Sequence, residues 1–292
     1  MQRYLVVALV STMLAGGSYG GTVVVSPGNM NGWAFDATDN NGSIASATGA
    51  PYTSAIGQMV YGPATPPLGV GSAELATAVN GGDGASKIST AAYDGLPLSS
   101  ILQLSFSTYD TANNGQQFPY IELAVSPDGS GSPATEDSLF FEPPYQTPSA
   151  GGPIVPNQGA TVMNQWQTWN ASTGGWWDNN AQLYDPTLYT PATAIAGGGY
   201  GLVNTLATYE GLYPNATIMD NPYPGNGDGG ITIQVGYGSS SDVYTGYVDN
   251  VTIGTASGTT TFDFEPVPEP ATVTLVGAGL MGMLFIVRRR KV

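Results

Sequence analysis

Short runs in which apolar and polar residues alternate recur along the middle of the chain. In ILQLSFSTY, the apolar Leu102, Leu104 and Phe106 alternate with Gln103, Ser105 and Ser107. Three further runs share this period, with apolar positions at Ile121, Leu123 and Val125; at Ile231, Ile233 and Val235; and at Phe262 and Phe264. Because successive side chains of a strand point to opposite faces, this period predicts half-buried strands.

One segment has a helical period instead. In YGLVNTLATYEGLYP, four apolar and aromatic residues recur at helical spacing: Leu202, Leu206, Tyr209 and Tyr213. Gly211 and Pro214 are the residues expected to end this helix. Glycine-rich stretches such as NGGDG separate the strand-like runs. The sequence therefore predicts an all-β body over residues 21–265: an antiparallel β-sandwich, jelly-roll or concanavalin-like, with one short helix.

The first 20 residues have the pattern of a secretory signal peptide. Arg3 precedes an apolar stretch from Tyr4 to Ala15, and small residues follow up to Gly20. This stretch is short for a membrane span but suits the helical core of a cleaved signal. We therefore expect residues 1–20 to direct export and to be removed.

The C-terminal end has three parts. Residues 266–270 form a proline-rich tether, which neither a helix nor a strand ladder accommodates. Residues 271–287 carry no charge and would cover about 25 Å as a helix, the short limit for a membrane span. Residues 288–292 hold Arg288, Arg289, Arg290 and Lys291, which predict a cytoplasmic stop-transfer tail.

Pro268, Glu269 and Pro270, followed by this short span and the basic end, together resemble the PEP-CTERM sorting signal of Gram-negative bacteria. The resemblance implies an exosortase-type enzyme as a partner, a transient anchor in the inner membrane, and hosts that make exopolysaccharide. It implies a final location at the cell surface or in the extracellular matrix.

Charge and composition narrow the chemistry of the body. The chain has 21 acidic and 6 basic residues. Arg3, Glu269 and the four bases of the tail lie outside the body, which therefore has 20 acids, one base (Lys87) and a net charge of −19. Such a body repels phosphate, which excludes nucleic acid as a partner. The absence of His and Cys excludes disulfides, thiolate metal sites and His-dependent nucleophiles. Lys87 is expected to be a surface residue or a buried ion-pair partner.

Four tryptophans gather in WQTWNASTGGWW: Trp166, Trp169, Trp176 and Trp177. The intervening residues suit a turn, so we expect a hairpin that brings the indoles together. Each indole either packs in the core or forms an exposed platform for a sugar ring. Since Trp166 and Trp169 are three residues apart in a strand, they should point to opposite faces.

Asp249 is the candidate for a buried carboxylate. In YVDNVTI it is in phase with Tyr247, Val251 and Ile253, which predicts that it faces inward. A buried carboxylate requires hydrogen bonds or a cation. Three alternatives are open: capping of backbone N–H groups, a structural Ca²⁺ with Asp263 as a second ligand, or solvent exposure. No other cofactor is expected.

Another acidic stretch, DATDNNGS from Asp36, lacks the glycine and glutamate of a helix-loop-helix calcium site and is expected to be a solvated turn.

Parts of the body, including GWAF from Gly32 and VDNVTIG followed by TFDFE, resemble a group of uncharacterised secreted bacterial β-sandwich proteins. The last strand is also similar to those of jelly-roll carbohydrate-binding modules and concanavalin-like sandwiches. Three functions follow as hypotheses. The first is a non-enzymatic protein of the cell surface or matrix. The second is a carbohydrate-binding module for extracellular polysaccharide, and the third is a glycosidase or lyase that uses a carboxylate pair.

Overall fold

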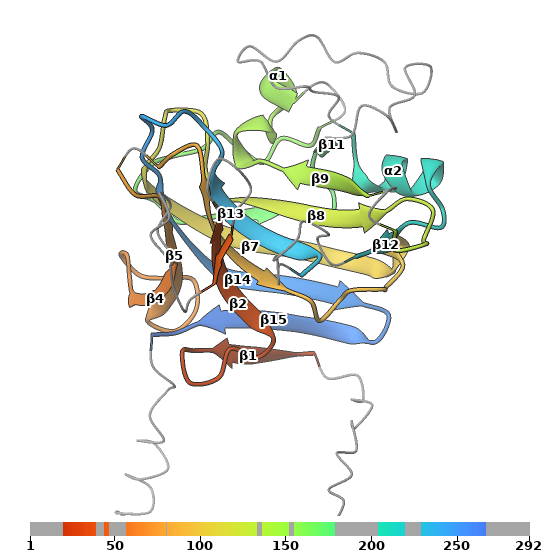
Figure 1. Ribbon diagram of the computed structural model, residues 1–292, viewed down its shortest axis with the longest axis horizontal. Coiled ribbons are helices and arrows are strands. Elements are labelled where there is room, and N and C mark those ends of the chain that lie inside the picture. Colours follow the sequence, from red (N-terminus) through yellow and green to blue (C-terminus); the bar gives the residue numbers. More distant parts are fainter. Residues whose placement is uncertain are drawn as a thin grey trace, which may run out of the picture.

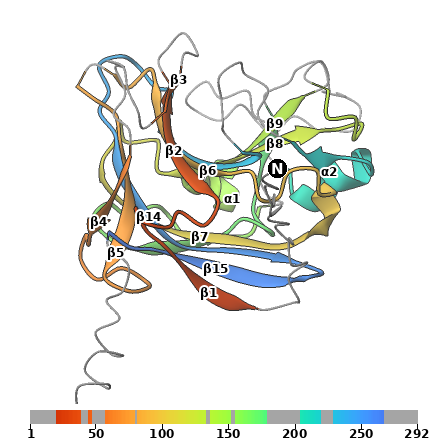
Figure 2. The same cartoon turned by 60° about the horizontal axis from the view of Figure 1, so that its bottom comes forward.

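Two β-sheets packed face to face make up the part of the chain that the computed structural model describes, namely residues 20–38, 44–46, 57–79, 81–132, 136–151, 155–178, 204–219 and 229–266. Figure 2 shows the two sheets as separate layers. The predicted all-β sandwich is confirmed. The predicted signal peptide up to residue 19 and the predicted membrane helix at 271–287 lie outside the described residues.

The first sheet has seven strands in the described residues: β1 (Gly21–Val25), β4 (Gln58–Tyr61), β5 (Gly71–Ala76), β7 (Ile101–Ala112), β10 (Gln167–Asn170), β14 (Thr245–Thr255) and β15 (Gly258–Phe264). The long β14 is its centre. Along one edge, β14 pairs with β7; along the other, it pairs first with β5 and then with β15.

The second sheet has eight described strands: β2 (Trp33–Thr38), β3 (Ile44–Ser46), β6 (Ala85–Thr90), β8 (Tyr120–Ser126), β9 (Asp137–Phe141), β11 (Trp177–Asp178), β12 (Thr217–Ile218) and β13 (Ile231–Gly236). Their order is β11-β9-β8-β13-β6-β2-β3, and β12 pairs with β8. Every pairing in this sheet is antiparallel.

Helices are short in the described residues. The α-helices are α1 (Pro148–Gly151) and α2 (Leu206–Leu212), and the 3₁₀ turns are η1 (Leu98–Ser100) and η3 (Pro143–Tyr145). The predicted helix is α2: Thr205 caps its first turn, and it ends before Pro214. Gly211 lies inside the helix and does not end it, and Leu202 lies outside the described residues.

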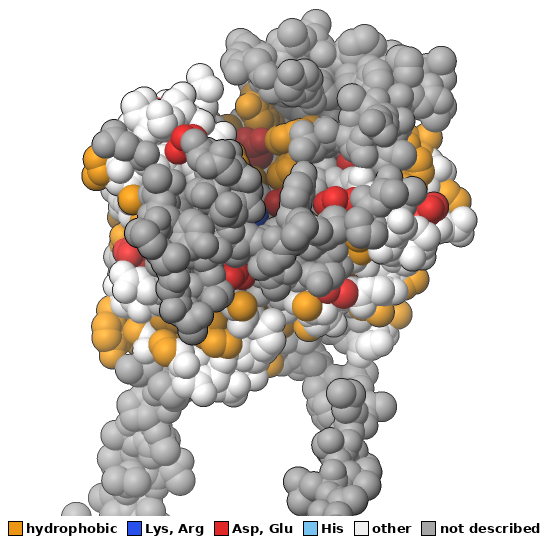
Figure 3. All heavy atoms as spheres, in the orientation of Figure 1, with side chains coloured by type: hydrophobic (Ala, Val, Ile, Leu, Met, Phe, Trp, Pro, Cys, Tyr) orange, Lys and Arg blue, Asp and Glu red, His pale blue; other side chains and the backbone are white. Residues whose placement is uncertain are grey.

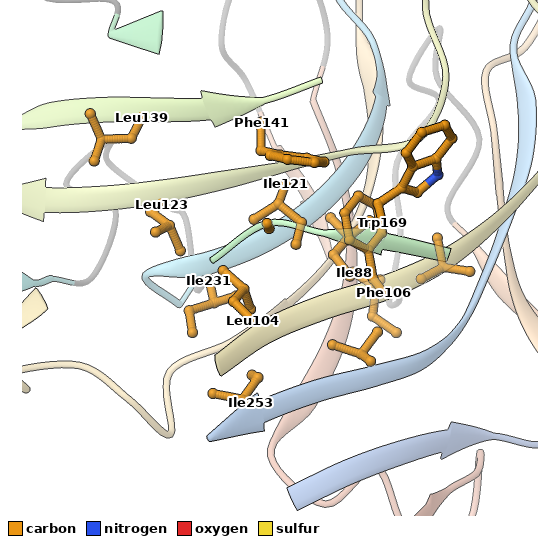
Figure 4. Packing of buried hydrophobic residues seen from close by; sticks show 14 of the residues in the cluster. Ile88, Leu104, Phe106, Ile121, Leu123, Leu139, Phe141, Trp169, Ile231 and Ile253 are labelled. Atoms are coloured by element: carbon orange, nitrogen blue, oxygen red, sulfur yellow. The ribbon is translucent and has the colours of Figure 1, made fainter. Parts of the chain in front are cut away.

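The core lies between the two sheets and is lined by the apolar side of each alternating strand. Its largest buried side chains include Trp169, Phe106 and Phe141, and Figure 4 shows them meeting aliphatic residues of both sheets. Phe106 and Phe141 come from opposite sheets and pack edge to face, with ring centroids 5.8 Å apart. This contact joins the layers through an arrangement that aromatic rings favour.

Strand alternation predicted most core positions correctly, but it wrongly placed Leu102 in the core. Leu104 and Phe106 are fully buried, whereas Leu102 is 64% exposed. The reason is a register shift between β14 and β7: Gly254 pairs with Gln103, and the next residue of β14 pairs with Ile101. Such a bulge leaves one residue unopposed, and Leu102 is that residue.

The expectation of half-buried strands also fails for the middle of the second sheet. All described side chains of β6, β8, β9 and β13 are buried, including those on the polar side of the alternation. Polar residues on that face therefore need partners within the protein.

The strands at the two ends of the body lie side by side. β1 pairs in parallel with β15, with Gly21 opposite Thr260 and Val25 opposite Phe264 (Figure 1). Because β14 pairs with the other edge of β15, the last strand has a neighbour on each side. The expected purely antiparallel arrangement therefore has one parallel pair.

Candidate functional site

The face of the eight-stranded sheet that points away from the core carries a row of polar side chains. Strand register places Tyr120 beside Gln234, Gln234 beside Lys87, and Lys87 beside Asp36. The chain neighbours of these residues enter the core, so the two-residue period directs the row to the outer face. We call this surface the outer polar face.

Glu122 occupies the next row of this face, beside Thr232 and Phe140. Its carboxylate accepts hydrogen bonds from Ser138 Oγ at 2.8 Å and from Gln234 Nε2 at 2.7 Å. The two rows are therefore joined through the Gln234 amide. A carboxylate bonded in this way is held in one orientation.

Aromatic rings form one end of the outer polar face. Trp177 of β11 stacks on Phe140, with centroids 4.3 Å apart and planes at 22°. The Trp177 Nε1–H donates to Glu142 Oε1 at 2.8 Å, which fixes the rotation of the indole. Tyr120 continues the aromatic group, 6.2 Å from Phe140. Trp177 stays partly exposed, so this end can be reached from solvent.

The body's only base lies at the other end of the face. Lys87 Nζ is 5.5 Å from the centre of the Tyr237 ring, within range of a cation–π interaction. The Tyr237 hydroxyl shares a hydrogen bond of 2.9 Å with Thr38 Oγ1. Lys87 is only 2% exposed. Of the two expectations for this residue, the surface position is therefore wrong.

The floor of the face is buried, and two of its atoms have no hydrogen-bond partner. Gln234 is fully buried and Ser89 is 1% exposed, yet Gln234 Oε1 and Ser89 Oγ accept or donate no hydrogen bond. Leaving a polar atom buried in this way costs about 1–3 kcal/mol. Figure 3 shows acidic side chains recessed beside apolar ones on this side of the molecule.

Burial shifts the acids around this face toward the protonated form. The pKa of Glu142 is raised to about 7 by burial, which the hydrogen bond from Trp177 opposes. The pKa of Glu136 is raised to about 7 by burial and by the charge of Glu122. Burial also raises the pKa of Tyr120 well above its ordinary value. At neutral pH the face can therefore offer both proton donors and acceptors.

The four candidate tryptophans do not form one cluster, and the hairpin prediction is wrong. Strand β10, with Trp169, pairs with β7 in the first sheet, whereas β11, with Trp177, pairs with β9 in the second. The turn expected between them is present at residues 171–173, but it carries the chain from one sheet to the other.

Trp169 and Trp176 are core residues. They are 0% and 3% exposed, and their indole N–H groups donate to Thr108 Oγ1 and to the Ala171 carbonyl oxygen, both at 2.8 Å. A sugar platform on either ring is therefore wrong, because both faces are packed. For Trp169 and Trp176, the prediction of core packing is therefore confirmed.

Trp166 lies on the other side of β10 from Trp169, as their spacing predicted. Its ring packs 5.6 Å from Tyr109 on the outer side of the first sheet, and its Nε1–H donates to the Pro63 carbonyl oxygen at 2.9 Å. Trp166 and Trp177 are thus both partly exposed, but they lie on opposite sides of the sandwich.

A second hollow, of about 650 Å³, lies over β7 and β10. Amide and hydroxyl side chains line it, among them Gln103, Gln158 and Asn170. The tryptophan at its wall, Trp169, is fully buried. This hollow therefore offers hydrogen bonds but no indole face for stacking.

Asp249 is buried, but it does not face the core. Val248 and Val251 both enter the core, although they are three residues apart. Both can do so because a register shift between Asp249 and Thr252 interrupts the alternation. Asn250 has a positive φ of 53° at this point. The predicted inward phase of Asp249 is therefore wrong, because a bulge separates it from the apolar positions that follow.

Backbone amides bind the Asp249 carboxylate where β14 changes its partner from β5 to β15. Asp249 Oδ2 accepts from Leu68 N at 2.8 Å, and Oδ1 accepts from Phe264 N at 3.2 Å. Burial raises the pKa of Asp249 to about 7, against these hydrogen bonds and with a further rise from the charge of Asp263. The contacts match the alternative of backbone capping.

Asp263 is near Asp249, as the predicted hairpin of their strands requires. Within the described ranges, no group of three or more acidic side chains is arranged to hold a metal ion. A calcium ion at Asp249 and Asp263 stays a prediction. Asp36 is not in a solvated turn, since β2 extends through it and buries it beside Lys87.

The sorting residues predicted at the C-terminus, Pro268, Glu269 and Pro270, and the basic residues 288–291 lie outside the described part of the chain. Across the residues that the structure does describe, no helix has the length and apolar character needed to cross a membrane.

Comparison with known proteins identifies the C-terminal segment and leaves the body without a match. No curated protein and no solved structure matches the chain. Residues 266–291 match the family model described as the PEP-CTERM protein-sorting motif. The chain therefore carries a PEP-CTERM signal, which marks it as an exported protein that exosortase-type machinery sorts to the cell envelope.

Proposed function

We propose that this chain is a non-enzymatic protein of the cell surface or extracellular matrix, whose β-sandwich body remains outside the cell after sorting. The proposal is supported by the position of the last described strand. Strand β15 stops at Phe264, and the matched sorting segment starts at residue 266. The matched signal therefore does not overlap any described strand of the body.

Contacts at Glu265 carry this argument. Its carboxylate accepts hydrogen bonds from Val70 N at 2.6 Å and Gly71 N at 3.3 Å, and its own N–H donates to the Val25 carbonyl oxygen at 2.8 Å. The body is thus fastened up to one residue before the matched segment.

Mass spectrometry of the protein from its producing cells tests the sorting step. We expect the mature protein in the envelope or matrix fraction to lack residues 271–292. Substitution of Glu269 by Gln should keep the C-terminal segment attached, whereas Glu210→Gln, on helix α2, should be processed normally. A mature chain that retains residues 271–292 where the sorting enzyme is active would overturn the proposal.

The non-enzymatic part needs a separate test. The chain has no His and no Cys, which removes the commonest nucleophile systems but leaves carboxylate pairs. Incubation of the purified protein with the exopolysaccharide of its producing cells should leave the polymer's size distribution unchanged in size-exclusion chromatography. A fall in polymer size that disappears in Glu122→Gln or Glu142→Gln would instead support a glycosidase or lyase.

A second candidate function is binding of extracellular polysaccharide. The observation that favours it is the outer polar face, where a partly exposed indole lies at one end and buried hydrogen-bonding groups without partners lie on strands further along the sheet. A matrix protein that holds polysaccharide needs both kinds of contact, because sugars present C–H faces and hydroxyl edges.

A further inference from the structure

We propose that the outer polar face binds a neutral saccharide, with Trp177 as its stacking surface and the side chains of Gln234 and Ser89 as its hydrogen-bonding floor. This inference rests on the second candidate function and extends it by naming the site and the class of sugar.

The first element is a positioned aromatic ring. Phe140 covers one face of the Trp177 indole, and the hydrogen bond to Glu142 fixes its orientation, while the ring stays partly exposed. A ring held in this way loses little conformational freedom when a ligand stacks on it. The flat C–H face of a sugar fits such a surface, because it is apolar and of similar width.

The second element is the set of hydrogen-bonding atoms left over on the floor. The Gln234 amide nitrogen is committed to Glu122, which leaves its Oε1 as an acceptor without a donor. Ser89 Oγ lies in the row of Thr232 and Glu122 and is likewise without a partner. One ligand hydroxyl can donate to Gln234 Oε1, and a second can accept from Ser89 Oγ.

The third element is charge, which selects a neutral ligand. Among the described residues Lys87 is the one base of this face, and it shares the face with Asp36 and Glu122, while Glu142 borders the ring. The body as a whole carries 20 acids. An anionic polymer would be repelled from this surface. A purely apolar ligand would leave Gln234 Oε1 and Ser89 Oγ without hydrogen-bond partners.

Isothermal titration of the full chain in detergent tests the proposal. The ligands are hexasaccharides of glucose, mannose, galactose and xylose, with hexagalacturonate as the acidic comparison. We expect at least one neutral hexasaccharide to bind with a dissociation constant below about 1 mM and hexagalacturonate to bind at least about tenfold more weakly.

Trp177→Ala should weaken binding about tenfold or more, and Trp166→Ala should change it less than about twofold. Trp166 is a matched control because it is also partly exposed and also donates its indole N–H, but it lies on the opposite side of the sandwich. Ser89→Ala is a variant that should fold normally, since it removes a hydroxyl that has no partner. It should weaken binding several-fold without lowering the melting temperature.

Three results would overturn the proposal. One is the absence of binding by every neutral hexasaccharide at about 10 mM, in which case water alone fills the floor. Another is preferential binding of hexagalacturonate, and the third is an equal loss of affinity in Trp177→Ala and Trp166→Ala. None of these results bears on sorting, which is read from the mass and location of the mature protein. The two proposals therefore fail separately.

Discussion

Replacing Glu142 by Gln should stabilise the protein at neutral pH and change its stability little in acid. Glu142 is buried, and its pKa is raised from the ordinary 4.5 to about 7. The amide oxygen of Gln can still accept the hydrogen bond that Trp177 Nε1–H donates. The substitution therefore keeps the contact and removes the cost of ionising a buried group.

The size and sign follow from the difference in proton binding between the folded and unfolded chains. Below about pH 4.5 the carboxyl is protonated in both states and contributes nothing. Between about pH 4.5 and 7 the unfolded chain releases its proton while the folded chain keeps it, so the free energy of unfolding falls as pH rises. The shift of about 2.5 pKa units corresponds to about 3.4 kcal/mol, reached above pH 7.

Urea unfolding of wild type and Glu142→Gln at pH 4, 5.5 and 8 measures this difference. We expect the variant to gain up to about 3 kcal/mol at pH 8, less at pH 5.5, and close to nothing at pH 4. The reasoning would be refuted by a gain that is the same at all three pH values, or by a variant less stable than wild type at pH 8.

Asp242→Asn supplies a control of opposite sign. Backbone and side-chain hydrogen bonds, first that from Ser239 N, lower the pKa of Asp242. A carboxyl with a lowered pKa stabilises the fold at neutral pH and loses that effect as the solution is acidified. Asp242→Asn should therefore be less stable than wild type at pH 8, with a deficit that largely persists at pH 4 and shrinks as the pH falls below the ordinary value of 3.8.

Three further predictions concern single side chains, each read as the free energy of unfolding in urea. Leu104→Ala should cost about 2–5 kcal/mol and Leu102→Ala less than about 0.5, because the bulge buries the first and exposes the second; similar costs would refute that register. Gly211→Ala should stabilise by about 0.5–1 kcal/mol, since a methyl group there meets open space inside α2, and a loss of stability would contradict that environment. Thr205→Ala should cost about 1 kcal/mol through the lost cap on Thr208 N, whereas Thr205→Ser should keep most of it.

The two-residue period predicted the sheets and the facing of most strands, because alternation is a local property of the chain. It failed at Leu102 and Asp249 for one reason: a bulge inserts a residue against a partner strand that is distant in sequence. Nothing in ILQLSFSTY or YVDNVTI signals where the partner shifts. The presence of Asn250 with a positive φ beside Asp249 is the nearest local trace.

The outer polar face was visible in the sequence only as the polar half of each alternation. The prediction of half-buried strands implies that Tyr120, Glu122 and Gln234 meet solvent, but they are buried, because a short strand shows its period and not what covers its second face. The hairpin predicted for the tryptophan segment failed for a related reason. The composition of a turn predicts that the chain reverses, but it does not specify which sheet the next strand joins.

The flanking of β15 by β1 and β14 would have a mechanical consequence whenever the chain is pulled from its C-terminal side. Tension applied through residue 266 acts along β15, parallel to both ladders, so it must slide the strand past five paired residues of β1 and five of β14 at once. A strand pulled lengthwise between two neighbours resists better than an edge strand peeled away one bond at a time. The two ladders would therefore resist unfolding of the body while such a pull acts along β15.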